Sequence, residues 1–312
     1  MINMMNMKKI IALLFIVITL SEVSAQQDPQ YSQYMYNTIS VNPGYAGTRN
    51  ALTVSGLHRS QWVGIDGAPS TQTFFLHAPV FNEKIGLGLS AVNDRIGPIN
   101  QSFIYGDFAY HLKINEHWKL GMGIKASLNM LQPKIATLET TTANDPSFVN
   151  STVRTTYSPN VGAGFYLYGD RMYIGISSPK LLQNKMQMSN DVQNNILIKR
   201  HFFVIAGTVL KINDDMKFKP TVLTKITSGA PISADLSAEF LLYDKWAFGV
   251  SHRWKESVSG LFNVNVMPQL KIGAAYDFTL TDLRKYNSGS FELMVIYDFI
   301  VKKDKLKSPR YF

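Results

Sequence analysis

Apolar residues alternate one by one with polar or small residues over long stretches of this chain, and no other feature constrains the fold as strongly. The alternation is clearest over residues 117–131, 232–242 and 269–278. Successive side chains of a β-strand point to opposite faces, so each stretch predicts a strand with one apolar face and one polar or small face. Strands of globular proteins usually have about 5–6 residues, whereas membrane-spanning strands have about 9–11. The lengths of these runs match membrane-spanning strands.

The same pattern predicts fourteen strands in all. They lie near residues 51–58, 71–78, 85–92, 101–113, 117–131, 159–168, 171–179, 200–212, 216–226, 232–242, 244–255, 258–266, 269–278 and 290–301. An even number of strands lets an antiparallel barrel close with both ends on one side, as outer-membrane barrels do. Closure also leaves no sheet edge whose backbone groups would face lipid without a partner.

The lengths of the connections support a membrane barrel. Links after the even-numbered strands are short, as at 169–170 and 213–215, whereas most links after the odd-numbered strands are longer, as at 59–70 and 132–158. Outer-membrane barrels have short periplasmic turns and long extracellular loops. The links near 227–231 and 256–257 are short although they belong to the long-loop side, so the rule is followed only in part.

Aromatic residues and composition separate a barrel from the alternative all-β fold. Trp246 and Trp254 lie eight residues apart on one face of a predicted strand, roughly 20 Å apart along the membrane normal after a tilt of about 40°. Aromatic girdles flank an apolar band about 25 Å tall, although two core tryptophans of a soluble sandwich are the alternative. A periplasmic β-sandwich or jelly roll should have a densely charged surface, but only 17% of this chain is charged, so we expect a transmembrane outer-membrane β-barrel.

The amino-terminal residues predict export. Lys8 and Lys9 precede an apolar stretch at 10–20, and the small residues at 23–25 suit signal-peptide cleavage after Ala25. An uncleaved amphipathic anchor is the alternative. We therefore divide the chain into a signal peptide at 1–25, a plug or periplasmic segment at 26–50, a barrel at 51–301 and a basic tail at 302–312.

Two terminal segments carry specific expectations. Residues 26–50 contain Tyr31, Tyr34, Met35 and Tyr36, whose spacing suits a short amphipathic helix; we hypothesise that this helix packs inside the barrel as a plug. The tail at 302–312 holds five basic residues against one acidic residue. On the periplasmic side it could meet an acidic protein or anionic lipid, or it could simply be a solubilising rim.

The chain shows no catalytic, cofactor-binding or metal-binding pattern. It contains no cysteine, and no two of its six histidines have the spacing of metal ligands. Glycine pairs at 86–88 and 121–123 resemble phosphate loops but fall within predicted strands, where small residues on a crowded inner face explain them better. Ser251 and His252 are neighbours on a strand and point to opposite faces. We expect no enzyme, no cofactor and no nucleic-acid partner.

Candidate partner contacts lie on two predicted outer loops. The loop at 59–70 holds Arg59, Trp62 and Asp66, and tryptophan and arginine are enriched at interface hot spots. Alternatively, Trp62 folds into the barrel mouth as part of the plug. On the next loop Asp94 and Arg95 could form a rim ion pair contributing about 0–1 kcal/mol.

Several segments resemble a known family. They lie at Gln27–Thr48, Arg59–Thr73, Lys84–Pro98, Tyr173–Leu182, Phe218–Phe240, Ala275–Thr279 and Ser308–Phe312. Together they resemble the PorP/SprF family of type IX secretion system outer-membrane proteins, found in Bacteroidetes. One departure is Phe291, where the family pattern usually has a histidine.

This resemblance implies an integral outer-membrane barrel that works in type IX secretion and gliding motility without catalysis. Some members associate with ring and motor components of the secretion machinery, and others are paired with one large secreted adhesin that they export or hold by its C-terminal domain. No site residue transfers from the family. We expect a docking or anchoring component. The alternative is a porin-like solute transporter, whose aqueous channel would be lined by the charged residues Lys119, Lys125, Asp235, Glu239 and Lys271.

Overall fold

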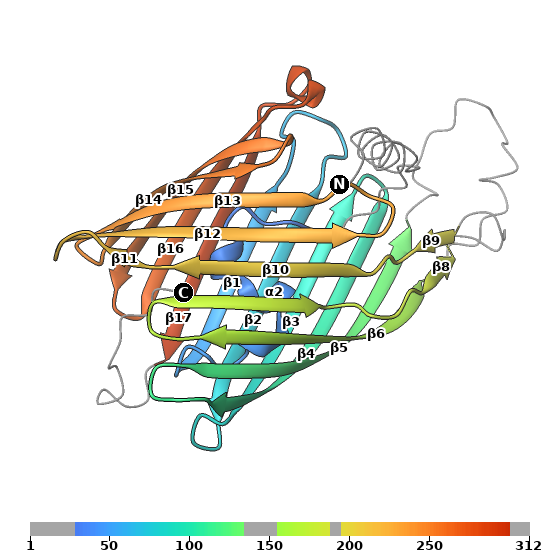
Figure 1. Ribbon diagram of the computed structural model, residues 1–312. Helices are drawn as coiled ribbons and strands as arrows, with labels where there is room; N and C mark the ends of the chain where they lie inside the picture. The colour runs from blue at the N-terminus through green and yellow to red at the C-terminus, as the bar shows by residue number, and fades with distance from the viewer. Residues whose placement is uncertain (1–28, 134–154, 188–194, 300–312) are drawn as a thin grey trace, which may run out of the picture.

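The computed structural model describes residues 29–133, 155–187 and 195–299 and is built almost entirely of strands (Figure 1). The first half of the barrel contains β1 (Leu52–Ser60), β2 (Ser70–Val80), β3 (Ile85–Ile96), β4 (Ile99–Lys113), β5 (Lys119–Pro133), β6 (Thr156–Tyr168) and β7 (Met172–Ser178). The second half contains β10 (His201–Thr208), β11 (Leu210–Lys211), β12 (Met216–Thr227), β13 (Ser233–Leu242), β14 (Trp246–Arg253), β15 (Ser257–Met267), β16 (Leu270–Thr279) and β17 (Ser290–Phe299). None of the helices in these parts of the chain has the length and apolarity needed to cross a lipid bilayer.

The strands form a closed antiparallel barrel. Each strand pairs with its neighbours in the chain, β1 pairs with β17, and β10 pairs with β12, so the ring has no open edge. The two-residue β11 continues β10 beyond an interruption at Val209, which makes fourteen barrel strands. The predicted fold class and strand number are therefore confirmed. Outside the barrel, β8 (Lys185–Gln187) and β9 (Asn195–Leu197) form a small hairpin between β7 and β10.

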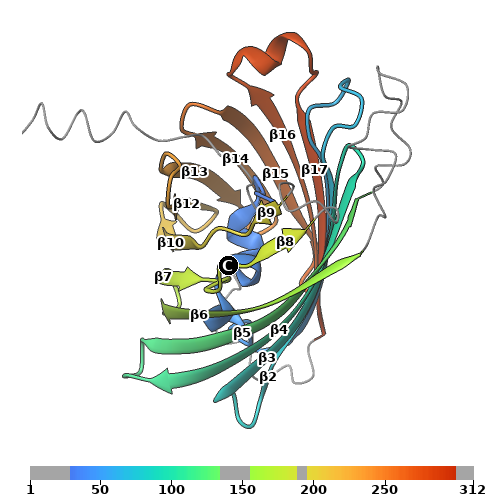
Figure 2. The ribbon, with the colours of Figure 1, turned by 90° about the vertical axis from the view of Figure 1, so that its right-hand side faces the viewer.

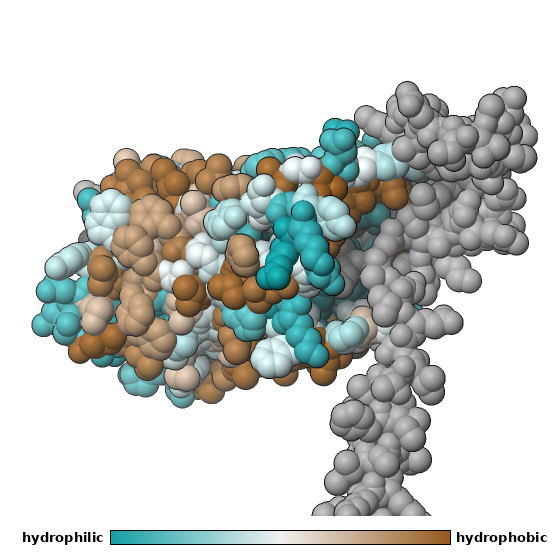
Figure 3. Space-filling view, turned by 90° about the horizontal axis from the view of Figure 1, so that it is seen from above, coloured by the Kyte–Doolittle hydropathy of each residue, from teal (hydrophilic) through white to brown (hydrophobic). Residues whose placement is uncertain are grey.

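Side chains alternate between the lumen and the outer surface, as the pattern predicts. In β13, Asp235, Ser237 and Glu239 are buried in the lumen, whereas Leu236 and Phe240 are exposed on the outside. Apolar residues cover much of the side of the barrel that Figure 3 shows. This arrangement reverses that of a soluble protein because the surrounding solvent of a membrane barrel is hydrocarbon.

The two rims differ in their connections. Short turns at 81–84, 114–118 and 243–245 lie on the rim where β1 begins and β17 ends. Connections at 61–69 and 280–289 lie on the opposite rim, which we call the outer rim because long loops of such barrels are extracellular.

Residues 29–50 lie inside the barrel, and we call them the plug (Figure 2). The plug contains the 3-10 turns η1 (Tyr34–Tyr36) and η2 (Pro43–Tyr45) and the one-turn helix α2 (Thr38–Val41). Its apolar side chains form the main core together with inward residues of the wall. The short helix predicted around Tyr34, Met35 and Tyr36 is present as the 3-10 turn η1, which the one-turn α2 follows. It is buried on all sides rather than amphipathic, because wall residues surround the plug.

The predicted signal peptide at 1–25 and the basic tail at 302–312 lie outside the described residues.

Candidate functional site

The plug runs through the lumen from the outer rim to the inner rim. Pro29 and Gln30 line a pocket at the outer mouth, together with residues from the outer ends of the strands. At the other end, the Gly47 amide donates to His77 Nδ1 at 3.1 Å, and Arg49 forms an ion pair of 2.9 Å with Asp298 near the end of β17. The plug therefore enters from the outer mouth and reaches the inner rim, where β1 begins.

Glycines of the wall let the plug backbone approach closely. A Cβ on Gly86 of β3 would overlap the Ala46 carbonyl, and a Cβ on Gly121 of β5 would overlap the Gly44 carbonyl. Only a residue without a side chain fits at such contacts. This explains the glycine pairs within the strands: they provide room for the plug rather than a phosphate.

Tyrosine hydroxyls connect the plug to several strands. The Tyr31 hydroxyl lies 2.6 Å from Thr73 Oγ1, and the Tyr34 hydroxyl donates to the Asp235 carbonyl at 3.2 Å. The Tyr36 hydroxyl donates to Glu239 Oε2 at 3.0 Å. Met35 is 1% exposed within the same core. The structure thus places the four candidate plug residues inside the lumen, each in contact with the wall.

Two buried ion pairs of the barrel wall hold the middle of the plug. Lys125 Nζ lies 2.7 Å from Asp107 Oδ1 and donates to the Ile39 carbonyl at 3.2 Å, with both charged side chains fully buried. Lys219 pairs with Glu239 at 3.4 Å and donates to the Tyr36 hydroxyl. These lumen charges bind each other and the plug, so they line no open aqueous channel at these positions.

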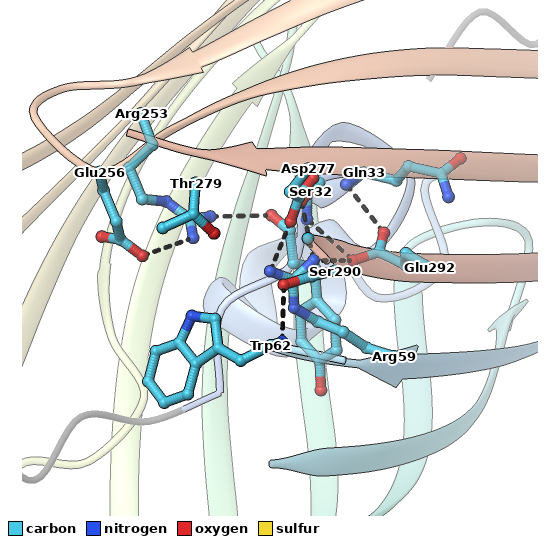
Figure 4. Close-up of polar contacts among 12 residues, drawn as sticks. Ser32, Gln33, Arg59, Trp62, Arg253, Glu256, Asp277, Thr279, Ser290 and Glu292 are labelled. Carbon is cyan, nitrogen blue, oxygen red and sulfur yellow. Dashed lines mark hydrogen bonds and ion pairs between the residues drawn. The ribbon is translucent and has the colours of Figure 1, made fainter. Parts of the chain in front are cut away.

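A second network lies just below the outer mouth (Figure 4). Arg59 contacts Asp277 at 2.6 Å and Glu292 at 3.2 Å, and it donates to Ser32 Oγ at 2.9 Å. Ser32 in turn donates to Asp277 Oδ1 at 2.7 Å, and its backbone amide donates to Glu292 at 2.9 Å. One arginine of β1 thus joins β16, β17 and the start of the plug.

Arg253 forms the matching network on the other side of the mouth. It contacts Asp235 at 2.7 Å and Glu256 at 3.3 Å, and its Nη2 reaches the Tyr31 carbonyl at 3.5 Å. Arg253 and Asp235 are buried, whereas the Glu256 side chain is 47% exposed. Both mouth arginines therefore bind carboxylates of the wall and an atom of the plug.

A pocket of about 340 Å³ opens at this mouth. Its polar lining includes Arg59, Asp94, Arg253, Glu256 and Asp277, and its apolar lining includes Pro29, Trp62, Pro69, Ile96 and Leu283. The half-buried Trp62 has φ +47°, a left-handed conformation that costs energy in a non-glycine residue, and its amide donates to Ser290 Oγ at 3.1 Å. Strained residues held in this way concentrate at binding sites.

The predicted partner contacts on the loop at 59–70 do not all lie in a loop. Trp62 lines the mouth pocket, as the second alternative for this residue expects, and Asp66 is exposed on the loop at 61–69. The placement of Arg59 in a loop is wrong: it is the penultimate residue of β1 and only 2% exposed, because it faces the lumen and binds buried carboxylates.

Asp94 and Arg95 also lie in a strand rather than a loop, so this prediction is wrong. The β3–β4 pairing continues through Ile96 and Ile99, and Gly97 with φ +52° closes a two-residue turn. Adjacent strand residues point to opposite faces. Asp94 therefore faces inward, where Thr71 donates to it at 2.6 Å, while Arg95 faces out, so the expected pair between them does not form.

Sequence reasoning missed the residues that complete the mouth. Asp277, Glu292 and Arg253 occupy inward positions near the outer ends of their strands. The alternation of side chains could have identified them, because it shows which charged residues face the lumen near the outer end of a strand. Their partners could not be found in this way, because Arg59 and Asp277 are joined only when β1, β17 and β16 lie side by side.

A comparison with protein-family models now adds to this geometry. The model described as "Type IX secretion system membrane protein PorP/SprF" matches residues 23–297. The chain belongs to the PorP/SprF family. It is accordingly a membrane component of the type IX secretion system, located in the outer membrane, and family membership implies interaction with the secretion machinery.

Solved structures resemble this PorP/SprF protein only distantly. The CymD monoaromatic hydrocarbon channel is 12% identical with a TM-score of 0.48, over 86% of this chain and 93% of that chain. The outer-membrane protein Omp33 of Acinetobacter baumannii is 10% identical with a TM-score of 0.45, over 81% and 100%. A FadL homologue of Pseudomonas aeruginosa is 14% identical with a TM-score of 0.42, over 80% and 89%. A search of curated protein sequences finds no match.

Proposed function

We propose that this PorP/SprF protein is a non-catalytic docking or anchoring component of type IX secretion and gliding motility. Its outer mouth holds a secreted surface adhesin by the adhesin's C-terminal domain, or a subunit of the machinery. The observation that carries this proposal is the filled lumen: the plug binds wall strands from rim to rim through buried charges. A barrel filled in this way offers a rigid surface rather than a passage.

The outer mouth has the properties of a binding surface. Trp62 contributes a large half-buried aromatic side chain, and Leu283 of the turn η4 (Asp282–Lys285) is 39% exposed beside the same pocket. Tryptophan anchors dominate many protein interfaces when a pocket holds them in place. The barrel strands and the Arg59 network support the loops at 61–69 and 280–289, so little ordering of these loops is needed when a partner binds.

Site-specific photo-crosslinking in intact cells tests this proposal. A photoreactive residue at Asp66, exposed on an outer loop, should capture a large secreted adhesin or an outward-facing machinery protein. The same residue at Tyr243, 70% exposed in a turn of the inner rim, is the matched control. It should capture only periplasmic proteins.

Purification of a tagged copy from native outer membranes, followed by mass spectrometry, then identifies the partner. A large adhesin as the main companion indicates an anchor, and ring or motor proteins indicate a core secretion component. If purification under conditions that preserve other membrane complexes returns the barrel alone, and position 66 captures nothing, the docking function is rejected.

A further inference from the structure

The mouth pocket is more acidic than basic. Its two guanidinium groups, Arg59 and Arg253, each already contact two carboxylates. A further carboxylate, Asp94, lines the same pocket and accepts from Thr71. The carboxylates of the pocket and of its arginine network are Asp94, Asp235, Glu256, Asp277 and Glu292. Among the residues that the structure describes, three of these carboxylates (Asp94, Glu256 and Asp277) and the two guanidinium groups line the pocket itself, so a cation entering the pocket is attracted and an anion is repelled.

The opposite side of the pocket is apolar. Trp62, Pro69, Ile96 and Leu283 line it. Lysine and arginine side chains bury their methylene stems along apolar surfaces while the charged head reaches polar groups. A cation near a tryptophan ring is further stabilised by the ring electrons. The volume of about 340 Å³ lies within the range of about 300–1,000 Å³ that is usual for ligand pockets.

From these observations we infer that the pocket binds a lysine or arginine side chain in an extended segment of the docked protein. The charged head contacts Glu256, and the stem lies along Trp62. This inference rests on the proposed docking function and adds to it the chemistry that the partner must present.

Glu256 is the carboxylate that an incoming cation meets first. Its side chain is 47% exposed, whereas those of Asp277 and Glu292 are nearly or fully buried behind Arg59. Lys255 belongs to the same turn but is exposed and is absent from the pocket lining. Glu256 accepts from Arg253 through Oε1, but its exposed side chain can still be reached from the opening.

Peptide binding to the purified full-length barrel in detergent tests this inference. The probe is the capped tripeptide Gly-Arg-Gly, and its matched control carries citrulline, a neutral side chain of nearly the same shape. Isothermal titration should show at least tenfold tighter binding of the arginine peptide. Glu256→Gln should weaken arginine binding about tenfold, whereas Asp282→Asn, which changes an exposed carboxylate outside the pocket lining, should leave it unchanged.

Three results would overturn the inference. The first is equal binding of the arginine and citrulline peptides, and the second is arginine binding that Glu256→Gln does not alter. The third is binding that appears only after residues 26–28 are deleted, because this chain's own upstream segment would then be the occupant.

The proposed function fails separately. If position 66 still captures a secreted protein while the barrel shows no preference for arginine, only the cation pocket is rejected. If position 66 captures nothing and purification returns the barrel alone, the docking function itself is rejected, whatever the peptides do.

Discussion

At the scale of single residues, paired charges hold the lumen together. Removing one partner of a buried ion pair leaves an uncompensated charge and costs about 3–5 kcal/mol, whereas an exposed pair contributes about 0–1 kcal/mol. Lys125→Met keeps the aliphatic stem but leaves Asp107 buried and unpaired. We expect it to lower the free energy of unfolding by about 3–5 kcal/mol, as measured by urea titration of the barrel in lipid vesicles.

The control for this prediction is the same substitution at an exposed pair. Lys285→Met removes the partner of Asp282 on η4, where both side chains are largely exposed. It should change the unfolding free energy by less than about 1 kcal/mol. Equal effects of the two substitutions would mean that the buried pair does not hold the wall and plug together.

At the scale of elements, the contact between plug and wall depends on glycine. Gly86→Ala places a Cβ against the Ala46 carbonyl and should push the plug away from β3. The chain has no cysteine, so a single Thr38→Cys substitution, at a position 0% exposed, reports on the plug alone. Maleimide labelling of this thiol should be slow in the parent and at least about tenfold faster with Gly86→Ala, since cysteine labelling follows access.

An outward glycine of the neighbouring strand provides the control. A Cβ on Gly106 of β4 would meet no atom within 4 Å. Gly106→Ala should therefore leave the labelling of Thr38→Cys unchanged. Faster labelling in both variants would indicate general loosening of the barrel rather than release of the plug.

At the scale of the whole molecule, the plugged lumen distinguishes a dock from a transporter. We expect the full-length barrel to be silent in a planar lipid bilayer, because the plug is bound on several sides from rim to rim. A variant lacking residues 31–48 should conduct ions steadily, since its polar inner face would line an aqueous channel.

The conductance measurement also distinguishes the docking function from the porin-like transporter. Steady conductance by the full-length barrel would favour the porin-like alternative. If the deletion variant does not fold, Gly86→Ala is measured in its place. Brief channel openings with Gly86→Ala, but not with Gly106→Ala, would likewise show that the plug closes the lumen.

The barrel could be predicted from the sequence, because each strand's two faces follow from a local alternation with a period of two residues. Trp246, for example, is the first residue of β14 and Trp254 directly follows its last residue, and the two side chains are 38% and 61% exposed. Local pattern also located the plug segment, because the spacing of Tyr31, Tyr34, Met35 and Tyr36 suits a short helix.

The assembly of the site, in contrast, follows from how distant strands pair in the folded barrel. The sequence pattern assigns Arg59 to a loop, but its pairing with Asp277 and Glu292 depends on β1 closing the ring against β17. Asp94 was likewise predicted in a loop but lies in β3, because the length of β3 is set by its pairing with β4. Contacts between residues more than two hundred positions apart depend on ring closure and register, which no local pattern contains.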